Sequence, residues 1–268
     1  AWPGCHVAHH GAAWILGAEG LGPPEGGGAL PDISVDPEDG VLSVINAGDG
    51  HRAFFLSLPA ESECIGASGR PLGCARARDD DGSARGVIAF VLVLGPRRVM
   101  DICQLRGVSD LRAVEVHSDI VDLQPQPAVQ PDLPSPYLCG FPLAGPGPYL
   151  CSQASGGRLT HFAHPSTYHA IDLDCDVGTE VLAVCDGVVQ EVRDSERVSG
   201  VDVRNFFRWN SVSVLHGDGT VAEYVHIQAG SAALGRGQRV RRGQPLCRSG
   251  DVGFCPRPHL HLELRAGE

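Results

Sequence analysis

The stretch RPHLHLELR, residues 257–265, decides the fold of the C-terminal half of this chain. Polar and apolar residues alternate through it, and the side chains of a strand point to opposite faces with a period of two. One face therefore carries three leucines and the other carries two histidines and a glutamate: Leu260, Leu262 and Leu264 against His259, His261 and Glu263. The pattern predicts a strand with an apolar core face and a second face that is either hydrated or functional.

The composition indicates a mainly β protein. The chain has 268 residues, of which 43% are hydrophobic and 20% charged, enough for one large or two modest globular domains. Its 35 glycines and 20 prolines, with only 6% aromatic residues, are typical of many turns and short strands rather than long helices. We therefore expect two domains built mostly from β-strands.

The charge distribution argues against several classes of partner. The formal net charge is -11 and the sequence contains no lysine, so no dense basic patch for nucleic acid or an anionic membrane surface is expected. No run of about 18 apolar residues predicts a transmembrane segment. The chain starts at Ala1 without the pattern of a signal peptide, as expected of a processed form or a fragment. The oligomeric state stays open.

Four segments differ in composition. Residues 1–32 mix Gly, Pro and Ala without a period, which predicts a flexible N-terminal segment. Residues 33–124 contain short β-rich runs, the pattern of a small β-sandwich-like domain of unknown role, with ARARDDDGSARG (75–86) as a solvated loop. Residues 125–146 predict a Pro-rich linker. Residues 147–268 form the second predicted domain, in which seven of the twelve histidines fall between residues 161 and 261.

The ten cysteines favour an oxidising compartment, although a chain of this size does not need disulfides to hold a core. The close pairs are Cys139 with Cys151, Cys175 with Cys185, and Cys247 with Cys255. Spacing does not fix connectivity, and buried free thiols are the alternative. No CxxC motif is present, which disfavours a structural zinc knuckle.

Two further strands offer polar side chains. In YHAIDLDC (168–175), alternation places Asp172 on one face with Ala170 and Asp174, opposite Ile171 and Leu173. In AEYVHI (222–227), alternation places His226 on the face of Tyr224. Together with the C-terminal strand, these supply the nitrogen and oxygen donors that zinc accepts, and three protein ligands plus a water are typical of a catalytic zinc site.

These segments resemble the lysostaphin/LytM-type zinc metalloendopeptidases, a family with the duplicated-hybrid-motif fold. The resemblance rests on HAIDLDCDVGTEVLAVCDGVV (169–189), EYVHI (223–227), GQRVRRGQPLCRSGDVG (237–253) and HLHLE (259–263), which occur in the family's order. It covers about residues 150–268 and implies a barrel-sandwich-like antiparallel sheet domain there. It implies nothing about residues 1–146.

The resemblance also implies the site. Asp172 and His261 would bind zinc, while His226 and His259 would flank the metal-bound water as the catalytic residues. The family's commonest first ligand lies four residues before the aspartate, where this chain has Tyr168. Some members carry that histidine further upstream after a glycine-rich lead, and SQASGGRLTH (152–161) resembles this form. We therefore favour His161 as the first ligand, with His169 and His164 as alternatives.

The implied activity is zinc-dependent hydrolysis of peptide bonds, with the peptide cross-links of bacterial cell walls (peptidoglycan) as substrate and an extracellular location, periplasmic in a bacterium. Glu263 is either a partner that fixes a histidine tautomer or a solvated carboxylate. A lipoyl or biotinyl carrier has a related architecture but needs a lysine, which this chain lacks. The remaining alternative is a secreted, non-catalytic binding protein that retains the peptidase fold.

Overall fold

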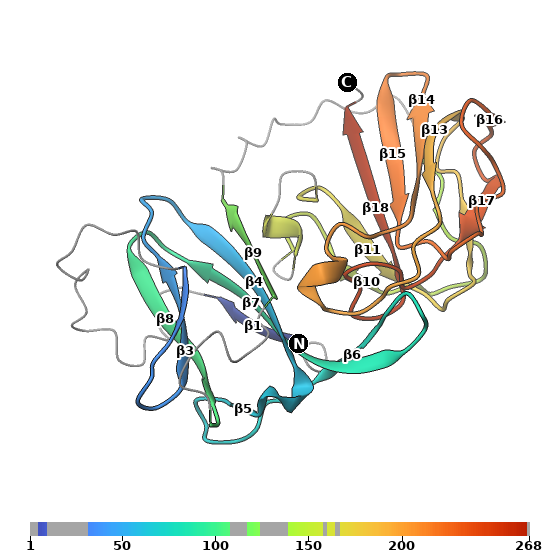
Figure 1. Ribbon diagram of the computed structural model, residues 1–268. Helices are drawn as coiled ribbons and strands as arrows, with labels where there is room; N and C mark the ends of the chain where they lie inside the picture. Colours follow the sequence, from blue (N-terminus) through green and yellow to red (C-terminus); the bar gives the residue numbers. More distant parts are fainter. Residues whose placement is uncertain are drawn as a thin grey trace. The chain divides into compact units, whose positions relative to one another are not determined.

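The computed structural model describes residues 5–9, 32–107, 117–123, 139–157, 160–163 and 167–266 (Figure 1). The described residues form strands and short 3-10 turns and contain no α-helix, which confirms the mainly β fold class. The chain divides into two compact units. Unit 1 comprises Ala1–Ala77, Arg85–Gln124 and Val201–Val203; unit 2 comprises Arg78–Ala84, Pro125–Gly200 and Arg204–Glu268.

Unit 1 is a sandwich of two sheets around one apolar core. The first sheet has the order β1-β7-β4-β9 with β6 paired to β7, and the second has the order β2-β3-β8-β5. The core includes Leu42 and Val44 from one sheet and Phe54, Leu56 and Phe90 from the other. The strands are β1 (Cys5–His9), β2 (Ile33–Val35), β3 (Val41–Asn46), β4 (Arg52–Pro59), β5 (Cys64–Ile65), β6 (Ala75–Arg78), β7 (Ala84–Leu94), β8 (Arg98–Leu105) and β9 (His117–Asp122), with a 3-10 turn, η1 (Ala60–Ser62).

Two parts of this region differ from the sequence-based expectation. Cys5–His9 form β1, parallel to β7, instead of an irregular lead-in, because the pairing partner lies about 80 residues away and is invisible to local composition. The remainder of 1–31 lies outside the described residues. ARARDDDGSARG is a hairpin rather than a loop: β6 and β7 flank a turn in which Asp79 N–H donates to the Ser83 carbonyl and Gly82 takes φ +84°.

Unit 2 contains a seven-stranded sheet of order β10-β11-β18-β15-β14-β13-β16 and a two-stranded sheet, β12-β17. Both sheets contribute to one core, in which Val181 and Leu246 pack with Val214, Tyr224 and Leu260. The strands are β10 (Cys151–Gln153), β11 (Ile171–Asp174), β12 (Glu180–Leu182), β13 (Gly187–Arg193), β14 (Ser211–His216), β15 (Thr220–Val225), β16 (Arg239–Val240), β17 (Pro245–Arg248) and β18 (His259–Ala266), with 3-10 turns η3 (His161–Ala163) and η4 (Val203–Asn205).

The opening stretch forms an interior strand of this sheet, as β18 between β11 and β15 (Figure 1). Leu260 and Leu262 are 0% and 5% exposed and belong to the core, as the alternation predicted, but Leu264, expected on the same core face, is 39% exposed near the end of the strand. The β13–β14 pair depends on a glycine: a Cβ on Gly187 would lie 2.5 Å from the Leu215 carbonyl oxygen and 2.6 Å from Val214 Cγ1. Close strand approach therefore requires glycine at this position.

Nine of the ten cysteines, those from Cys64 to Cys255, are free thiols. None of the three close pairs nominated from spacing is joined. Cys139 instead contacts Cys185, at 3.4 Å between sulfurs, and Cys64 interacts with Cys103. Most of the predicted Pro-rich linker, residues 125–138, lies outside the described residues. Its last residues are hydrogen-bonded within unit 2, where Gly140 N–H donates to the Val184 carbonyl at 2.6 Å. The sequence-based domain boundaries stay predictions.

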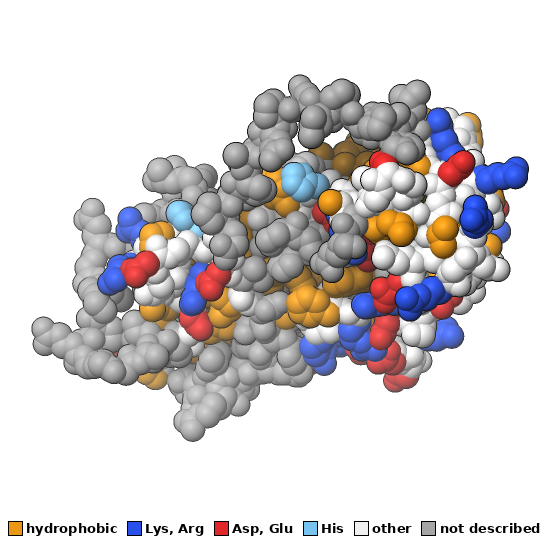
Figure 2. All heavy atoms as spheres, turned by 90° about the horizontal axis from the view of Figure 1, so that it is seen from above, with side chains coloured by type: hydrophobic (Ala, Val, Ile, Leu, Met, Phe, Trp, Pro, Cys, Tyr) orange, Lys and Arg blue, Asp and Glu red, His pale blue; other side chains and the backbone are white. Residues whose placement is uncertain are grey.

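Surface charge on unit 2 is mixed. Figure 2 shows arginine and acidic side chains interspersed over the right-hand part of the view, where unit 2 lies. Several of them are paired, such as Arg208 with Asp80 at 2.7 Å and with Glu196 at 2.6 Å. No helix in the described part of the chain has the length and apolar composition needed to span a bilayer.

Candidate metal centre

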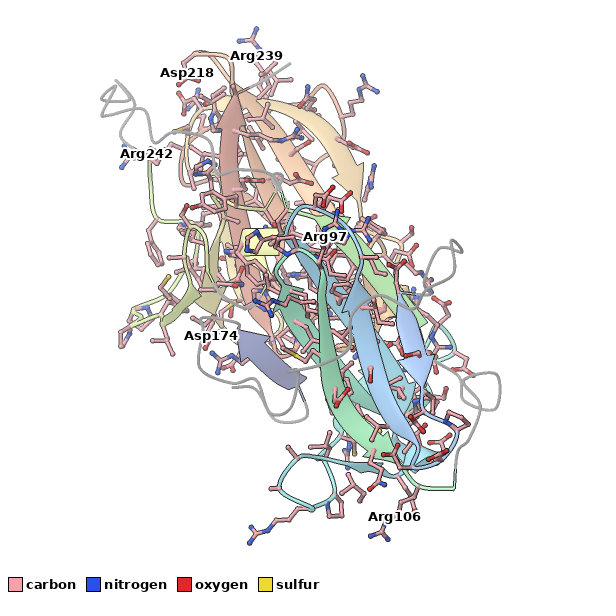
Figure 3. The ribbon with its side chains drawn as sticks, turned by 90° about the vertical axis from the view of Figure 1, so that its left-hand side faces the viewer. Arg97, Arg106, Asp174, Asp218, Arg239 and Arg242 are labelled. Carbon is pink, nitrogen blue, oxygen red and sulfur yellow. The ribbon has the colours of Figure 1, made fainter. Side chains whose placement is uncertain are left out.

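Two neighbouring strands, β11 and β18, carry most of the polar residues singled out from the sequence. In their antiparallel register Asp172 lies opposite His261, and Asp174 lies opposite His259. Residues opposite one another on paired strands share one face of the sheet. Asp172, His259 and His261 are 2%, 4% and 8% exposed, so this face is not hydrated. Asp174, at the end of β11 (Figure 3), is ion-paired with Arg257 at 2.7 Å.

The third member of the cluster comes from the turn η3. His161 is 0% exposed, and its Nδ1–H donates to the Ala154 carbonyl at 3.1 Å. Its Nε2 then lies 3.1 Å from Asp172 Oδ1 and 3.2 Å from His261 Nδ1, while His261 Nδ1 lies 2.9 Å from Asp172 Oδ1. The structure thus brings together His161, Asp172 and His261, the three residues predicted to hold the metal.

Gln153 connects the turn to the strand. Its side-chain oxygen accepts hydrogen bonds from the backbone N–H groups of Thr160 and His161, at 2.9 and 3.3 Å. Its amide nitrogen donates to Asp172 Oδ2 at 2.8 Å, which leaves Oδ1 to face the histidines. Sequence reasoning missed this residue, although it lies within the glycine-rich lead that nominated His161.

The three atoms suit a zinc ion. If both histidines are neutral, His161 Nε2, His261 Nδ1 and Asp172 Oδ1 have at most one proton between them. Their three contacts of 2.9–3.2 Å therefore cannot all be hydrogen bonds, whereas a cation at the centre would attract all three atoms. Ligands about 2.0–2.1 Å from zinc in a tetrahedron are separated by about 3.3 Å, close to these distances. The partners at Ala154 and Gln153 occupy the other ring nitrogen and the other carboxylate oxygen, as outer partners of metal ligands do.

Electrostatics keep Asp172 ionised. Burial alone would raise the pKa of its carboxyl group, but its close polar contacts with His161 and His261 outweigh burial. The pKa of Asp172 is therefore held well below its usual range. An ionised carboxylate is the form that binds a divalent cation.

His226 reaches the site through an unusual backbone conformation. Tyr224 lies opposite Leu262 on the core face, so strict alternation would carry His226 toward that face, away from His261. The expectation that His226 shares a face with Tyr224 is therefore wrong. His226 instead adopts φ +63°, directly after β15 ends at Val225, and its ring comes within 4.7 Å of the His259 ring between centroids. A left-handed turn is rare for a residue with a side chain and is often found at functional sites.

The two flanking histidines are fixed by backbone carbonyls. His226 Nδ1–H donates to Val252 O at 2.6 Å, and His259 Nδ1–H donates to Arg257 O at 2.8 Å. Burial, reinforced by neighbouring histidines, lowers the pKa of His226 well below its usual value, and burial also lowers the pKa of His259. Both rings are therefore neutral near pH 7, each with Nε2 as the free lone pair; His259 Nε2 lies 3.5 Å from Asp172 Oδ1.

The other candidates lie elsewhere or differ from expectation. His169 is exposed and its Nδ1 lies 3.4 Å from Ser155 Oγ, so it does not join the cluster; His164 lies outside the described residues. Glu263 is 4% exposed, so the solvated alternative is wrong; burial raises its pKa, and it accepts a hydrogen bond from the His169 backbone. Cys255, whose sulfur lies 3.4 Å from His259 Nδ1, was not anticipated at this site.

Comparison with known proteins places the C-terminal part in a family. The family described as peptidase family M23 matches residues 166–268, a span that includes Asp172, His226, His259 and His261 but begins after His161. The peptidoglycan DD-endopeptidase ShyA of Vibrio cholerae is 31% identical over 106 residues, which cover 38% of this chain and 22% of ShyA. The glycyl-glycine endopeptidase ALE-1 of Staphylococcus capitis is 28% identical over 97 residues, 36% of this chain and 24% of ALE-1.

The matched region is about a fifth to a quarter of these relatives. Among solved structures, the catalytic domain of EnpA from Enterococcus faecalis is 25% identical, with a TM-score of 0.36, over 48% of this chain and 88% of that one. A putative peptidase M23 from Pseudomonas aeruginosa is 21% identical, with a TM-score of 0.36, over 86% of this chain and 89% of that one. On the family match, residues 166–268 of this chain belong to peptidase family M23, the lysostaphin/LytM-type peptidases.

Proposed function

We propose that this protein is a zinc-dependent endopeptidase that hydrolyses the peptide cross-links of peptidoglycan. His161, Asp172 and His261 would hold the metal, and His226 and His259 would act on the substrate. The observation that carries the proposal is the convergence of His161 Nε2, Asp172 Oδ1 and His261 Nδ1 within 3.2 Å of one another, beside a second pair of buried histidines.

A zinc ion bound there supplies a Lewis acid that polarises a peptide carbonyl and lowers the pKa of a coordinated water. Neutral His226, whose Nδ1–H is held by Val252 O, offers Nε2 to accept a proton. His259 Nε2 is oriented in the same way by the hydrogen bond from Nδ1–H to Arg257 O. Together the two rings can accept a proton, return it to the leaving amine, and stabilise the charge that develops on the carbonyl oxygen.

The substrate class is supported by the relatives. One is named a peptidoglycan DD-endopeptidase and another a glycyl-glycine endopeptidase. The matched family model covers Asp172 and the two C-terminal histidines. Such a substrate implies an extracellular location, periplasmic in a bacterium. Nothing in the sequence of unit 1 assigns it a role in the reaction.

Zinc content of the purified full chain tests the metal centre without knowledge of the substrate. The parent should contain at least one tightly held zinc per chain, and His161→Ala and Asp172→Ala should each contain one zinc fewer. His169→Ala is the matched control, because it removes a nearby exposed histidine that the structure keeps out of the cluster. Equal zinc loss in the control and in His161→Ala, or no zinc uptake by the parent, would refute the assignment.

Hydrolysis of purified peptidoglycan, followed by chromatography of the released fragments, tests the activity. His226→Ala and His259→Ala should retain zinc and lose turnover by about 10²–10⁴-fold, the usual contribution of general acid–base groups. A parent that binds zinc but releases no fragment would support the alternative of a binding protein with the peptidase fold. Full activity in either histidine variant would contradict the proton-transfer roles of His226 and His259.

A further inference from the structure

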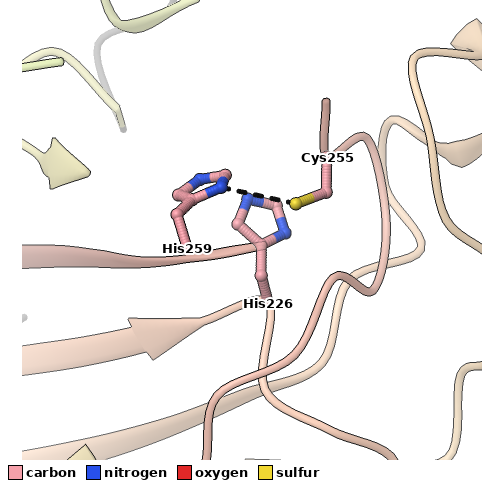
Figure 4. Close-up of side chains that lie close together, drawn as sticks. All are labelled: His226, Cys255 and His259. Carbon is pink, nitrogen blue, oxygen red and sulfur yellow. Dashed lines mark hydrogen bonds between the residues drawn. The ribbon is translucent and has the colours of Figure 1, made fainter. Parts of the chain in front are cut away.

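A second group of metal-type side chains lies beside the proposed metal centre. His226, Cys255 and His259 place a ring nitrogen, a sulfur and a ring nitrogen within 4.8 Å of one another. Figure 4 shows the Cys255 sulfur pointing at the His259 ring, with the His226 ring alongside. The proposed hydrolysis uses the two histidines and leaves the thiol without a role.

The geometry points to a second metal site at this cluster: we propose that His226, Cys255 and His259 bind a soft divalent ion such as Zn²⁺. Sulfur about 2.3 Å and nitrogen about 2.0 Å from a tetrahedral zinc are separated by about 3.5 Å, and Cys255 Sγ lies 3.4 Å from His259 Nδ1. A thiolate with two imidazoles selects zinc, cobalt or cadmium over magnesium or calcium.

The loop that carries Cys255 is held in place by its backbone. Gly253 has φ +96°, its N–H donates to the Val198 carbonyl at 2.8 Å, and a Cβ added there would lie 3.0 Å from the Trp209 side chain. The neighbouring Val252 carbonyl accepts the hydrogen bond from His226. The loop therefore fixes the cysteine and one histidine relative to each other before any ion binds, which lowers the entropic cost of binding.

Binding would change the protonation of the cluster. The Cys255 S–H donates to the Arg257 carbonyl at 2.9 Å, which also accepts from His259 Nδ1. Coordination replaces the thiol proton, so each ion bound releases one proton to solvent. The proton on His259 Nδ1 moves to Nε2 of the same ring, 3.5 Å from Asp172 Oδ1, and Nδ1 becomes a ligand. Arg257 O stays close to both donors and is available as an oxygen ligand.

Occupation of this site would limit activity. On the proposed function, His226 and His259 must be free to exchange protons, and an ion bound to both removes that capacity. The consequence rests on the proposed function, whereas the binding itself does not. Excess Zn²⁺ should therefore inhibit turnover, and Cys255→Ser should shift the inhibitory concentration upward by about tenfold or more, as loss of a ligand does.

Cobalt titration of the metal-free full chain tests the site directly. The parent should bind two equivalents of Co²⁺, one of them with a sulfur-to-cobalt charge-transfer band in the near ultraviolet. Cys255→Ser should lose that band and one equivalent, while Cys74→Ser, which alters an exposed thiol in unit 1, should keep both. His161→Ala should lose the other equivalent and keep the band, so the two sites fail independently.

The outcomes that overturn the proposal are equally direct. Absence of the charge-transfer band in the parent refutes it whatever the variants do, and a band that survives Cys255→Ser assigns the ion to another thiol. If the serine variant does not fold, Cys255→Ala gives the same comparison. A band in the parent together with no hydrolysis of peptidoglycan would sustain the second site and reject only the proposed function.

Discussion

The left-handed backbone of His226 leads to a stability prediction that reverses the usual order of alanine and glycine. His226→Ala and His226→Gly both remove the imidazole and its hydrogen bond to Val252, so these losses cancel in the comparison. The variants differ by one methyl group at φ +63°. An L-residue in this region costs about 1–2 kcal/mol, whereas glycine adopts it freely.

The magnitude follows from two opposing terms. A glycine variant loses about 0.5–1 kcal/mol of folding free energy relative to an alanine variant, because glycine makes the unfolded chain more flexible. Relief of about 1–2 kcal/mol at the left-handed position exceeds this, so His226→Gly should be the more stable variant by about 1 kcal/mol. For a chain of this size that difference raises the melting temperature by about 2–4 °C.

Thermal unfolding of the two full-length variants, followed by circular dichroism, measures the difference. Ala222→Gly is the matched control, because Ala222 lies in β15, the strand that precedes His226, is 0% exposed and has no positive φ. Ala222→Gly should lower the melting temperature, whereas at residue 226 the glycine variant should melt at a higher temperature than the alanine variant. If His226→Ala were as stable as His226→Gly or more so, the left-handed turn would not be what directs His226 to the site.

Three further changes test the fold and the metal centre. Gly187→Ala should destabilise unit 2 by about 1–3 kcal/mol in urea unfolding, because its Cβ would overlap the β14 backbone, whereas Gly217→Ala, with open space around it, should be neutral. Burial lowers the pKa of His216 in the folded chain. In the unfolded chain this histidine is protonated below about pH 6.5, whereas in the folded chain it stays neutral to lower pH. Stability should therefore fall as the pH drops from 7.5 to 5, and less so in His216→Gln; equal slopes would contradict this. Gln153→Ala should weaken zinc binding by about 10–100-fold in a chelator competition. Unchanged affinity would show that Gln153 is not needed to position the turn that carries His161.

The C-terminal strand could be predicted from sequence because the alternation that indicates it lies within the strand itself. A period of two in residues 259–264 predicts the two faces of the strand; Leu260 and Leu262 are buried as expected, whereas Leu264, near the end of β18, is exposed. The same reasoning failed at His226. A single residue with positive φ turns its side chain to the opposite face of the sheet, and the residue type histidine does not predict this conformation. It failed too at Cys5–His9, where the partner strand is distant in the sequence.

His161, the proposed first metal ligand, shows why part of a site escapes pattern analysis. Asp172 and His261 are placed by strand register, which a period can predict, but His161 sits in a 3-10 turn where no period applies. Its position is set by Gln153, which bonds the backbone of the turn on one side and the Asp172 carboxylate on the other. A histidine moved off the strand can therefore keep its place in a cluster only if a polar side chain ties the turn back to the sheet. In this chain the side-chain amide of Gln153 positions the histidine, as strand register positions Asp172 and His261. A search for upstream ligands in related sequences should therefore look for the amide together with the histidine.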